Sequence, residues 1–184
     1  MKTYIKYLLV FLVITACNND DSRKTHKNPI DQLPPMTTSG KNTIGCLVNG
    51  VPFTDSGLMN NYYQLVEGEY YLAINWENGF GDNFKDGQIG LIKTQIVEGE
   101  TYLLNTSRAS LETFTRGSAN YTFANNSNSG EYQTNSNYYG KVTFTKFDTE
   151  NGIMSGTFEF EAQELNSEEI VNITEGRFDL TFNQ

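Results

Sequence analysis

Histidine is almost absent from this sequence, and its absence excludes much of the usual hydrolytic and zinc chemistry. The one histidine, His26, lies in a polar stretch near the N-terminus. A Ser-His-Asp or Cys-His arrangement needs a histidine beside its nucleophile, and catalytic zinc sites commonly use histidine ligands. We therefore expect a protein that is not an enzyme and that uses no cofactor and no metal ion.

Positive charge is also scarce. Lys and Arg number 13 against 22 Asp and Glu, which gives a formal net charge of −9. Nucleic acids and anionic membrane surfaces attract basic proteins, so neither is an expected partner. Cysteine is rarer still, with Cys17 and Cys46 alone. Cys46 stands at the start of an apolar run, where a buried small thiol is expected.

The longest apolar run, residues 8–16, is too short to span a bilayer. It follows a lysine-containing start and ends directly before Cys17, which is the pattern of a secretion signal. The segment Ile14-Thr15-Ala16-Cys17 resembles a bacterial lipobox, with isoleucine where leucine is more usual. The resemblance implies a lipoprotein signal peptide over residues 1–16 and a lipid bilayer as the partner of acylated Cys17. A plain secretory signal with an incidental cysteine is the alternative.

Residues 17–42 are expected to form the lipidated cysteine and a flexible tether. This stretch is polar and holds Pro29, Pro34 and Pro35, so it offers little apolar surface to bury. Asp20 and Asp21 resemble the acidic export signal that sends many Bacteroidetes lipoproteins to the cell surface. Simple solvation of a linker is the alternative. The expected location is the outer membrane, on the cell surface or the periplasmic face.

Residues 43–184 have the length of one domain, and their pattern is that of strands. Short apolar alternations recur between Gly, Asn and Asp turns, without a sustained helical period. We predict an all-β fold: a single antiparallel β-sandwich, or an open barrel. The clearest strand is 157–162, with Phe158, Phe160 and Ala162 on the core face and Glu159 and Glu161 on the solvent face.

Two local features, a hairpin and a β-bulge, are predicted from turn residues and from the alternation of apolar positions. The stretch 148–152 ends in Asn-Gly and should join the strand containing Val142 and Phe144 to strand 157–162 as a hairpin. In the last strand, the apolar positions change from odd, at Val171 and Ile173, to even, from Phe178 onward. One extra residue near Glu175-Gly176 would restore a common face, so we predict a β-bulge there.

Two segments at the ends of the expected domain resemble an uncharacterised Bacteroidetes lipoprotein family. The first is Leu33-Pro34-Pro35 followed by Asn42-Thr43-Ile44-Gly45-Cys46-Leu47-Val48-Asn49-Gly50, in which Ile44 replaces a more usual aromatic residue. The second is Ile173-Thr174-Glu175-Gly176-Arg177-Phe178-Asp179. The resemblance implies an envelope location and a class of domain, and carries no catalytic residue to this chain.

Aromatic and amide side chains gather between residues 118 and 139. Tyr rings can cover the apolar faces of sugars while amides satisfy hydroxyl groups. The candidate ligand-binding residues are Trp76, Tyr121, Tyr132, Tyr138 and Tyr139. The alternatives are a long polar loop whose tyrosines pack at its ends and, for Trp76, burial in a strand.

The acidic residues give weaker indications of a calcium site or of a catalytic carboxylate pair. Residues 82–87 fail the spacing of a calcium loop, and an ordinary exposed loop is expected there. A looser calcium site elsewhere among the loops is the alternative. A glycosidase needs two opposed carboxylates, and the sequence offers no means of choosing a pair. The expected function is therefore that of an outer-membrane lipoprotein with a binding or structural β-domain, whose partner is a glycan or an envelope protein. A glycan-binding accessory protein of an uptake system is the main alternative, and a carboxylate-dependent hydrolase is the next.

Overall fold

The computed structural model describes residues 28–55, 60–81, 83–107 and 116–184. The expected signal peptide, Cys17, Asp20, Asp21 and His26 lie outside them. No helix within these ranges is long and apolar enough to cross a membrane. The elements are a 3-10 helix, η1 (Pro29–Gln32), and the strands β1 (Thr43–Val48), β2 (Val51–Thr54), β3 (Tyr62–Val66), β4 (Glu69–Phe80), β5 (Asn83–Ile92), β6 (Thr101–Thr106), β7 (Arg116–Asn125), β8 (Asn128–Gln133), β9 (Gly140–Asp148), β10 (Ile153–Glu164) and β11 (Ile170–Thr181).

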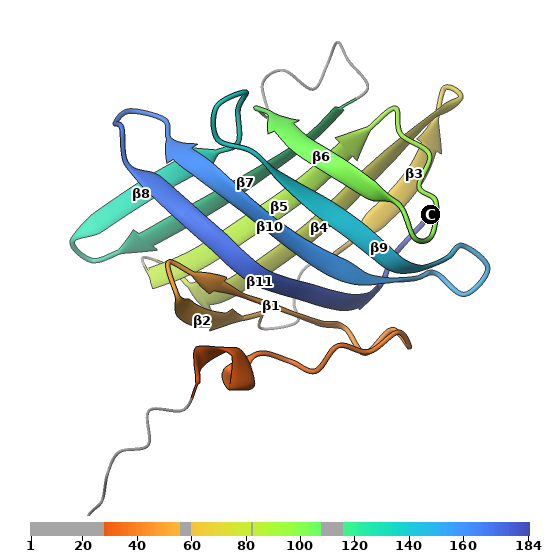
Figure 1. Cartoon of the computed structure of the whole chain (residues 1–184), viewed down its shortest axis with the longest axis horizontal. Coiled ribbons are helices and arrows are strands. Elements are labelled where there is room, and N and C mark those ends of the chain that lie inside the picture. Colours follow the sequence, from red (N-terminus) through yellow and green to blue (C-terminus); the bar gives the residue numbers. More distant parts are fainter. Residues whose placement is uncertain (1–27, 56–59, 82, 108–115) are drawn as a thin grey trace, which may run out of the picture.

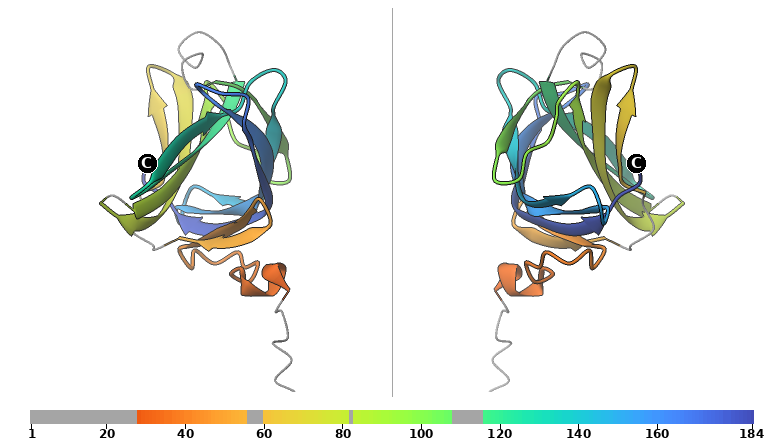
Figure 2. Two further views of the ribbon diagram at one scale, coloured as in Figure 1. Left: turned by 90° about the vertical axis from the view of Figure 1, so that its left-hand side faces the viewer. Right: turned by 90° about the vertical axis from the view of Figure 1, so that its right-hand side faces the viewer.

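The described strands form one sheet that curls around a single interior (Figures 1 and 2). The strand order is β2-β1-β11-β10-β9-β6-β7-β5-β4-β3, and β8 pairs with both β10 and β7. Pairing between the named strands is antiparallel apart from the parallel contact of β6 with β7, and an isolated parallel bridge joins Tyr62 in β3 to Asn183. Hydrogen bonds link the two ends of this order: Tyr63 N in β3 donates to the Asn183 carbonyl (2.8 Å), just after β11, and Glu77 N in β4 donates to Asp55 Oδ1 (2.8 Å), just after β2. The all-β class is confirmed. The two-sheet sandwich that was expected first is replaced by one continuous, mostly antiparallel sheet, which is nearer to the barrel alternative.

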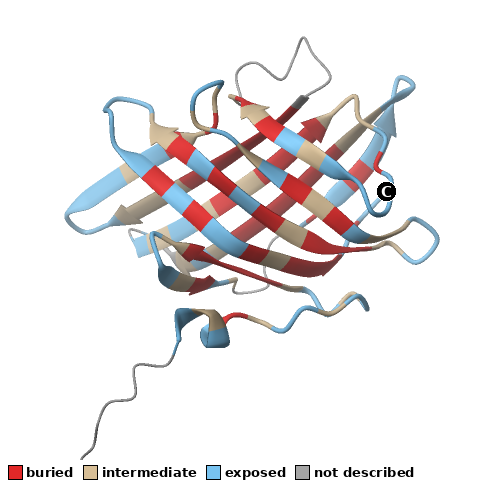
Figure 3. Ribbon diagram, viewed as in Figure 1, coloured by how far each residue is buried: buried red, intermediate tan, exposed pale blue. Residues whose placement is uncertain are grey.

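The core faces of β9 and β10 match the expected alternation. Phe158, Phe160 and Ala162 are buried while Glu159 and Glu161 are exposed. In β9, Val142 and Phe144 are buried as well. Figure 3 shows the resulting alternation of buried and exposed positions along these strands. The hairpin is also confirmed, because Asp148 Oδ1 accepts hydrogen bonds from the backbone N–H groups of Glu150 and Asn151 in the connecting turn.

Glycines face large aromatic rings across neighbouring strands throughout the sheet. The register pairs are Trp76 with Gly87, Phe123 with Gly130, Phe160 with Gly140, Phe178 with Gly156 and Phe158 with Gly176. A methyl group added at Gly87 would lie 2.3 Å from a carbon of the Trp76 ring. The rings therefore fill the space that the glycine side chains leave empty, and this allows a tightly curled sheet to keep a filled core.

The bulge in β11 lies where the sequence parity predicts it. Phe158 pairs with Gly176 and Phe160 pairs with Ile173, so β11 has one residue more than β10 over the same span. Glu175 has a φ of +54°, and Ile173 and Phe178 on either side are both buried. The extra residue thus returns the two halves of β11 to one core face.

The flexible tether that was expected to extend to residue 42 is not what the structure shows for residues 33–41, which pack against the sheet. After η1, Leu33 is buried, and Pro34 packs so closely on Gly45 that a methyl group there would lie 2.6 Å from Pro34 Cδ. Residues 33–41, here called the strap, run along β1 on the outside of the sheet (Figure 1). Composition indicated too little apolar surface for folding, but the strap is held by proline packing and by polar contacts to Asp179.

Two stretches interpreted as loops are strands. Residues 83–87 of the expected exposed loop belong to β5, which pairs with β4 and β7. Most of 118–139 forms the β7–β8 hairpin, whose turn lies at residues 126–127. Asn, Ser and Gly are poor strand formers, and here cross-strand aromatic packing overrides their preference.

Candidate functional site

The structure corrects three of the candidate ligand-binding residues. Trp76, Tyr121 and Tyr132 are buried in the core, with Trp76 0 % exposed. Trp76 packs at 5.1 Å from the Phe158 ring and Tyr121 at 6.2 Å from Tyr132. Burial raises the pKa of both tyrosine hydroxyls. These rings are covered by protein and offer no face to a ligand.

Tyr139 alone among the candidates is well exposed, at 57 %, and Tyr138 is half-buried. The segment between β8 and β9 that carries them is well fixed. Asn135 Oδ1 accepts from the backbone N–H groups of Asn137 and Tyr138, at 2.8 and 3.0 Å. Glu161 N in β10 donates to the Tyr139 carbonyl (3.1 Å). The Tyr139 ring is thus presented to solvent from a backbone that is already ordered.

Buried Thr134 anchors the start of the same segment. Its Oγ1 donates to the carbonyl of Thr106 (2.7 Å) and accepts from Ala119 N (2.9 Å). Thr134 thereby joins β6, β7 and the β8–β9 connection at the place where the sheet branches. The segment that carries Tyr139 begins from this rigid point.

Tyr139 borders one of two adjoining hollows on the outer face of β6, β9, β10 and β11. This hollow, of about 330 Å³, is lined by Tyr139, Leu103 and Ile173 together with polar groups that include Lys141 and Glu161. Leu103 is 58 % exposed, although it lies in the middle of a strand. An exposed leucine beside an exposed tyrosine makes this hollow the more apolar of the two.

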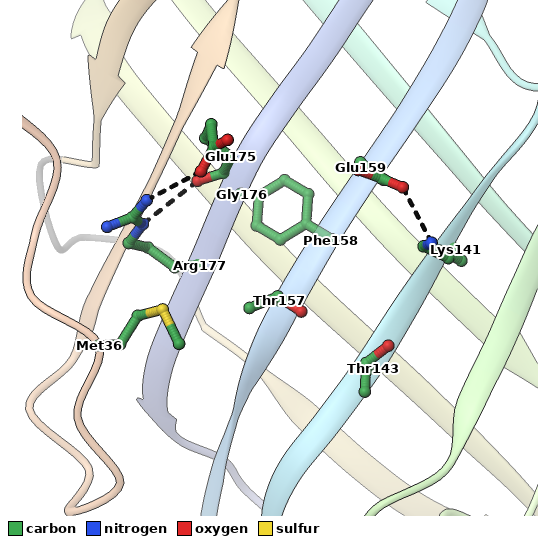
Figure 4. Close-up of a pocket in the computed structure, with 9 residues that line it drawn as sticks. All are labelled: Met36, Lys141, Thr143, Thr157, Phe158, Glu159, Glu175, Gly176 and Arg177. Atoms are coloured by element: carbon green, nitrogen blue, oxygen red, sulfur yellow. Dashed lines mark hydrogen bonds and ion pairs between the residues drawn. The ribbon is translucent and has the colours of Figure 1, made fainter. Parts of the chain in front are cut away.

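The second hollow, of about 350 Å³, is more polar and is bordered by Met36 of the strap. Figure 4 shows two ion pairs on either side of Phe158. Lys141 Nζ lies 3.0 Å from Glu159 Oε1, and Arg177 Nη2 lies 3.4 Å from Glu175 Oε2. Lys141 and Glu159 line both hollows, so the two adjoin at this ion pair, and together they are here called the outer groove.

Strand register and the bulge explain the shape of the outer groove. Leu103 pairs with Lys141, which pairs with Glu159, so these side chains form one row across three strands. A second row runs from Thr143 through Thr157 to Arg177. Between the rows, the bulge turns β11 and places Gly176, which has no side chain, beside Phe158. The Phe158 ring fills the space that this missing side chain leaves.

Sequence reasoning missed Leu103, Lys141 and Arg177 as members of one site. Each lies in a different strand, and only the pairing of β6, β9, β10 and β11 brings them together. One signal for the outer groove was present in the sequence: Glu159 and Glu161 alternate with core residues and so lie on the outer face of β10. That face was interpreted only as solvent-exposed. The exposed leucine at Leu103 could not be recognised without the register.

Two potentially reactive side chains among the described residues, Cys46 and Glu164, have shifted pKa values. Burial raises the pKa of the Cys46 thiol to about 12, so it is a poor nucleophile. The expectation of a buried thiol is confirmed. Glu164 follows the exposed Glu161 in β10, and a hydrogen bond from Asn166 N lowers its pKa, which is opposite to the shift that a general acid needs. The described residues contain no group of three His, Cys, Asp or Glu suited to a metal ion.

A family model described as a domain of unknown function (DUF6252) matches residues 83–180. The matched segment includes all four strands of the outer groove and the closing residues 173–179, but not the segment 33–50. No curated protein and no solved structure matches the chain.

Proposed function

Since the chain belongs to the DUF6252 family of domains of unknown function, we propose its role from its own sequence and geometry. The protein is a lipoprotein of the outer membrane in a member of the Bacteroidetes, and its β-domain binds a ligand in the outer groove. The observation that carries the binding role is the outer groove itself. Leu103 and Tyr139, exposed by 58 % and 57 %, stand beside ion-paired Lys141 and Glu159.

The position of the groove favours binding over a purely structural role. It lies on the outer face of four strands whose inner faces are filled, so a ligand can occupy it without disturbing the core. Binding residues on a rigid scaffold need little ordering when the ligand arrives, and this reduces the entropy cost of association.

Anchoring is supported by the sequence of residues 8–17. Acylation of Cys17 would insert two or more chains into the bilayer, and two chains hold a protein stably where one holds it marginally. Asp20 and Asp21 support export to the cell surface. The first described element, η1, starts at Pro29, about a dozen residues after this anchor.

The first test addresses the anchor. Cys17→Ala should move the protein from the membrane fraction to the soluble fraction and abolish incorporation of radiolabelled fatty acid. Asn18→Ala, at the neighbouring position, serves as the matched control and should leave both unchanged. A Cys17→Ala protein that still fractionates with membranes would refute lipid anchoring.

The second test addresses the groove. A photo-crosslinking amino acid is placed at Leu103 in the full-length protein, and at Val97, which is 52 % exposed but outside the groove, as the control. Irradiation of intact cells should give a discrete adduct from position 103 and none from position 97. The same adduct from both positions, or none from position 103, would contradict a binding role for the groove.

A further inference from the structure

We propose that the ligand of the outer groove is an uncharged oligosaccharide that lies across β6, β9, β10 and β11 with one ring against Tyr139. This inference rests on the proposed binding role of the groove. It does not depend on the lipid anchor or on the side of the membrane.

Charge pairing in the groove favours an uncharged ligand. Lys141 is paired with Glu159 at 3.0 Å and Arg177 with Glu175 at 3.4 Å. An anionic ligand would have to displace a carboxylate from each cation, and exposed Glu161 adds a further negative charge. A cationic ligand would have to compete with Lys141 and Arg177 for the same carboxylates. A neutral ligand does not compete for any of these groups and leaves both ion pairs in place.

Hydrogen-bonding capacity in the groove suits hydroxyl groups. Each ion pair presents a strong donor and a strong acceptor side by side, and an adjacent pair of sugar hydroxyls both donates and accepts. Thr143 and Thr157 add hydroxyls between the pairs, and Asn172 adds an amide at the other hollow. A ligand made of hydroxyl-bearing rings can therefore use both ends of every pair.

Apolar surface in the groove suits the C–H face of a sugar ring. Tyr139 is more than half exposed, and its backbone is held by Glu161 N and by the turn around Asn135. A fixed ring loses little freedom when a ligand stacks on it. Leu103 extends the apolar surface beside Tyr139. Because the hollows adjoin at Lys141 and Glu159, one chain of several sugar rings can fill both.

Strand pairing argues against an extended peptide as the occupant. A peptide binds a sheet mainly by adding a strand to a free edge, where its backbone finds unpaired N–H and C=O groups. The groove lies in the middle of the sheet: β10 is paired with β9 on one side and with β11 on the other. Only side chains are available there, and they are those that suit a saccharide.

The test uses affinity electrophoresis of the full-length protein in detergent. Gels contain soluble neutral polysaccharides, namely α-1,4-, α-1,6-, β-1,3- and β-1,4-linked glucans, mannan and xylan, or polygalacturonate as an anionic polymer. At least one neutral polysaccharide should retard the protein, and polygalacturonate should not. Tyr139→Ala should weaken the retarding interaction about tenfold. Tyr62→Ala, at an exposed tyrosine outside the groove, should leave it unchanged.

The outcomes separate this inference from the proposed function. A position-103 adduct together with no retardation by any neutral polysaccharide would leave the groove as a binding site and overturn its assignment to saccharides. Retardation unaffected by Tyr139→Ala, or stronger retardation by polygalacturonate, would also overturn it. Absence of both the adduct and retardation would overturn the inference and the binding role together.

Discussion

Asp179 holds the strap against the sheet through one buried carboxylate that is 1 % exposed. It accepts hydrogen bonds from the hydroxyls of Thr37 and Ser155 and from the backbone N–H groups of residues 39–41, the latter at 2.7–3.2 Å. Burial disfavours the ionised carboxylate, but these hydrogen bonds outweigh it and hold the pKa of Asp179 at about 2. The ordinary value is 3.8, so folding favours the charged form.

The pH dependence of stability follows from this shift. A carboxyl group whose pKa is lowered by folding stabilises the protein above its unfolded pKa and loses that contribution as the pH falls toward the folded pKa. We expect Asp179→Asn to be less stable than wild type by about 2 kcal/mol at pH 7. The difference should shrink between pH 4 and pH 2, because the wild type loses its advantage there.

Urea denaturation across pH 2–7 measures this difference in the free energy of unfolding. Glu150→Gln, in the exposed β9–β10 turn, is the control and should follow the wild type at every pH. A difference between Asp179→Asn and wild type that stays constant from pH 7 to pH 2 would mean that ionisation of Asp179 is not what holds the strap.

At the scale of elements, the glycine–aromatic pairs join neighbouring strands. Trp76 in β4 covers Gly87 in β5, so Gly87→Ala should lower the free energy of unfolding by about 2 kcal/mol through overpacking. Trp76→Leu, which frees the space, should make the Gly87→Ala substitution less costly by at least about 1 kcal/mol. Chemical denaturation followed by far-UV circular dichroism measures the four proteins of this double-mutant cycle.

Gly68 provides the control cycle. Nothing lies within 4 Å of a methyl group added there, so the effects of Gly68→Ala and Trp76→Leu should simply add. Additivity in the Gly87 cycle as well would show that the ring and the glycine do not share space.

The same elements show what sequence alone can predict. Parity located the core faces of β9 and β10 and the bulge in β11, because each depends on residues close in sequence. The strap was missed because its anchor, Asp179, is remote in sequence, and a lone aspartate gives no sign of what it will bind. The β7–β8 hairpin was missed because many of its residues are Asn, Ser and Gly, which are typical of loops. The aromatic packing that stabilises it involves residues on opposite strands, which the sequence does not show to be neighbours.

At the scale of the whole molecule, the described interior is filled by aromatic and aliphatic side chains, and the proposed binding site lies on the outer face. The described core is one cluster of buried apolar side chains, and it extends from Ile44 in β1 to Phe178 in β11. The outer groove exists only when four strands have assembled, and its wall at Met36 depends on the strap as well. Sequence analysis could identify Tyr139 as a candidate but not its neighbours, since pairing across the sheet selects them.

The pairing of β1 with β11 also determines when, during synthesis, the curled sheet can be completed. Thr43 lies opposite Asp179, so β1 cannot complete this pairing until β11 has been synthesised. Contacts this remote in sequence form slowly, and no ribosome can supply β11 before the strands between have emerged. If the proposed secretion signal acts, this delay would be an advantage, because an unfolded polypeptide could pass through a narrow translocation channel and fold after it has crossed.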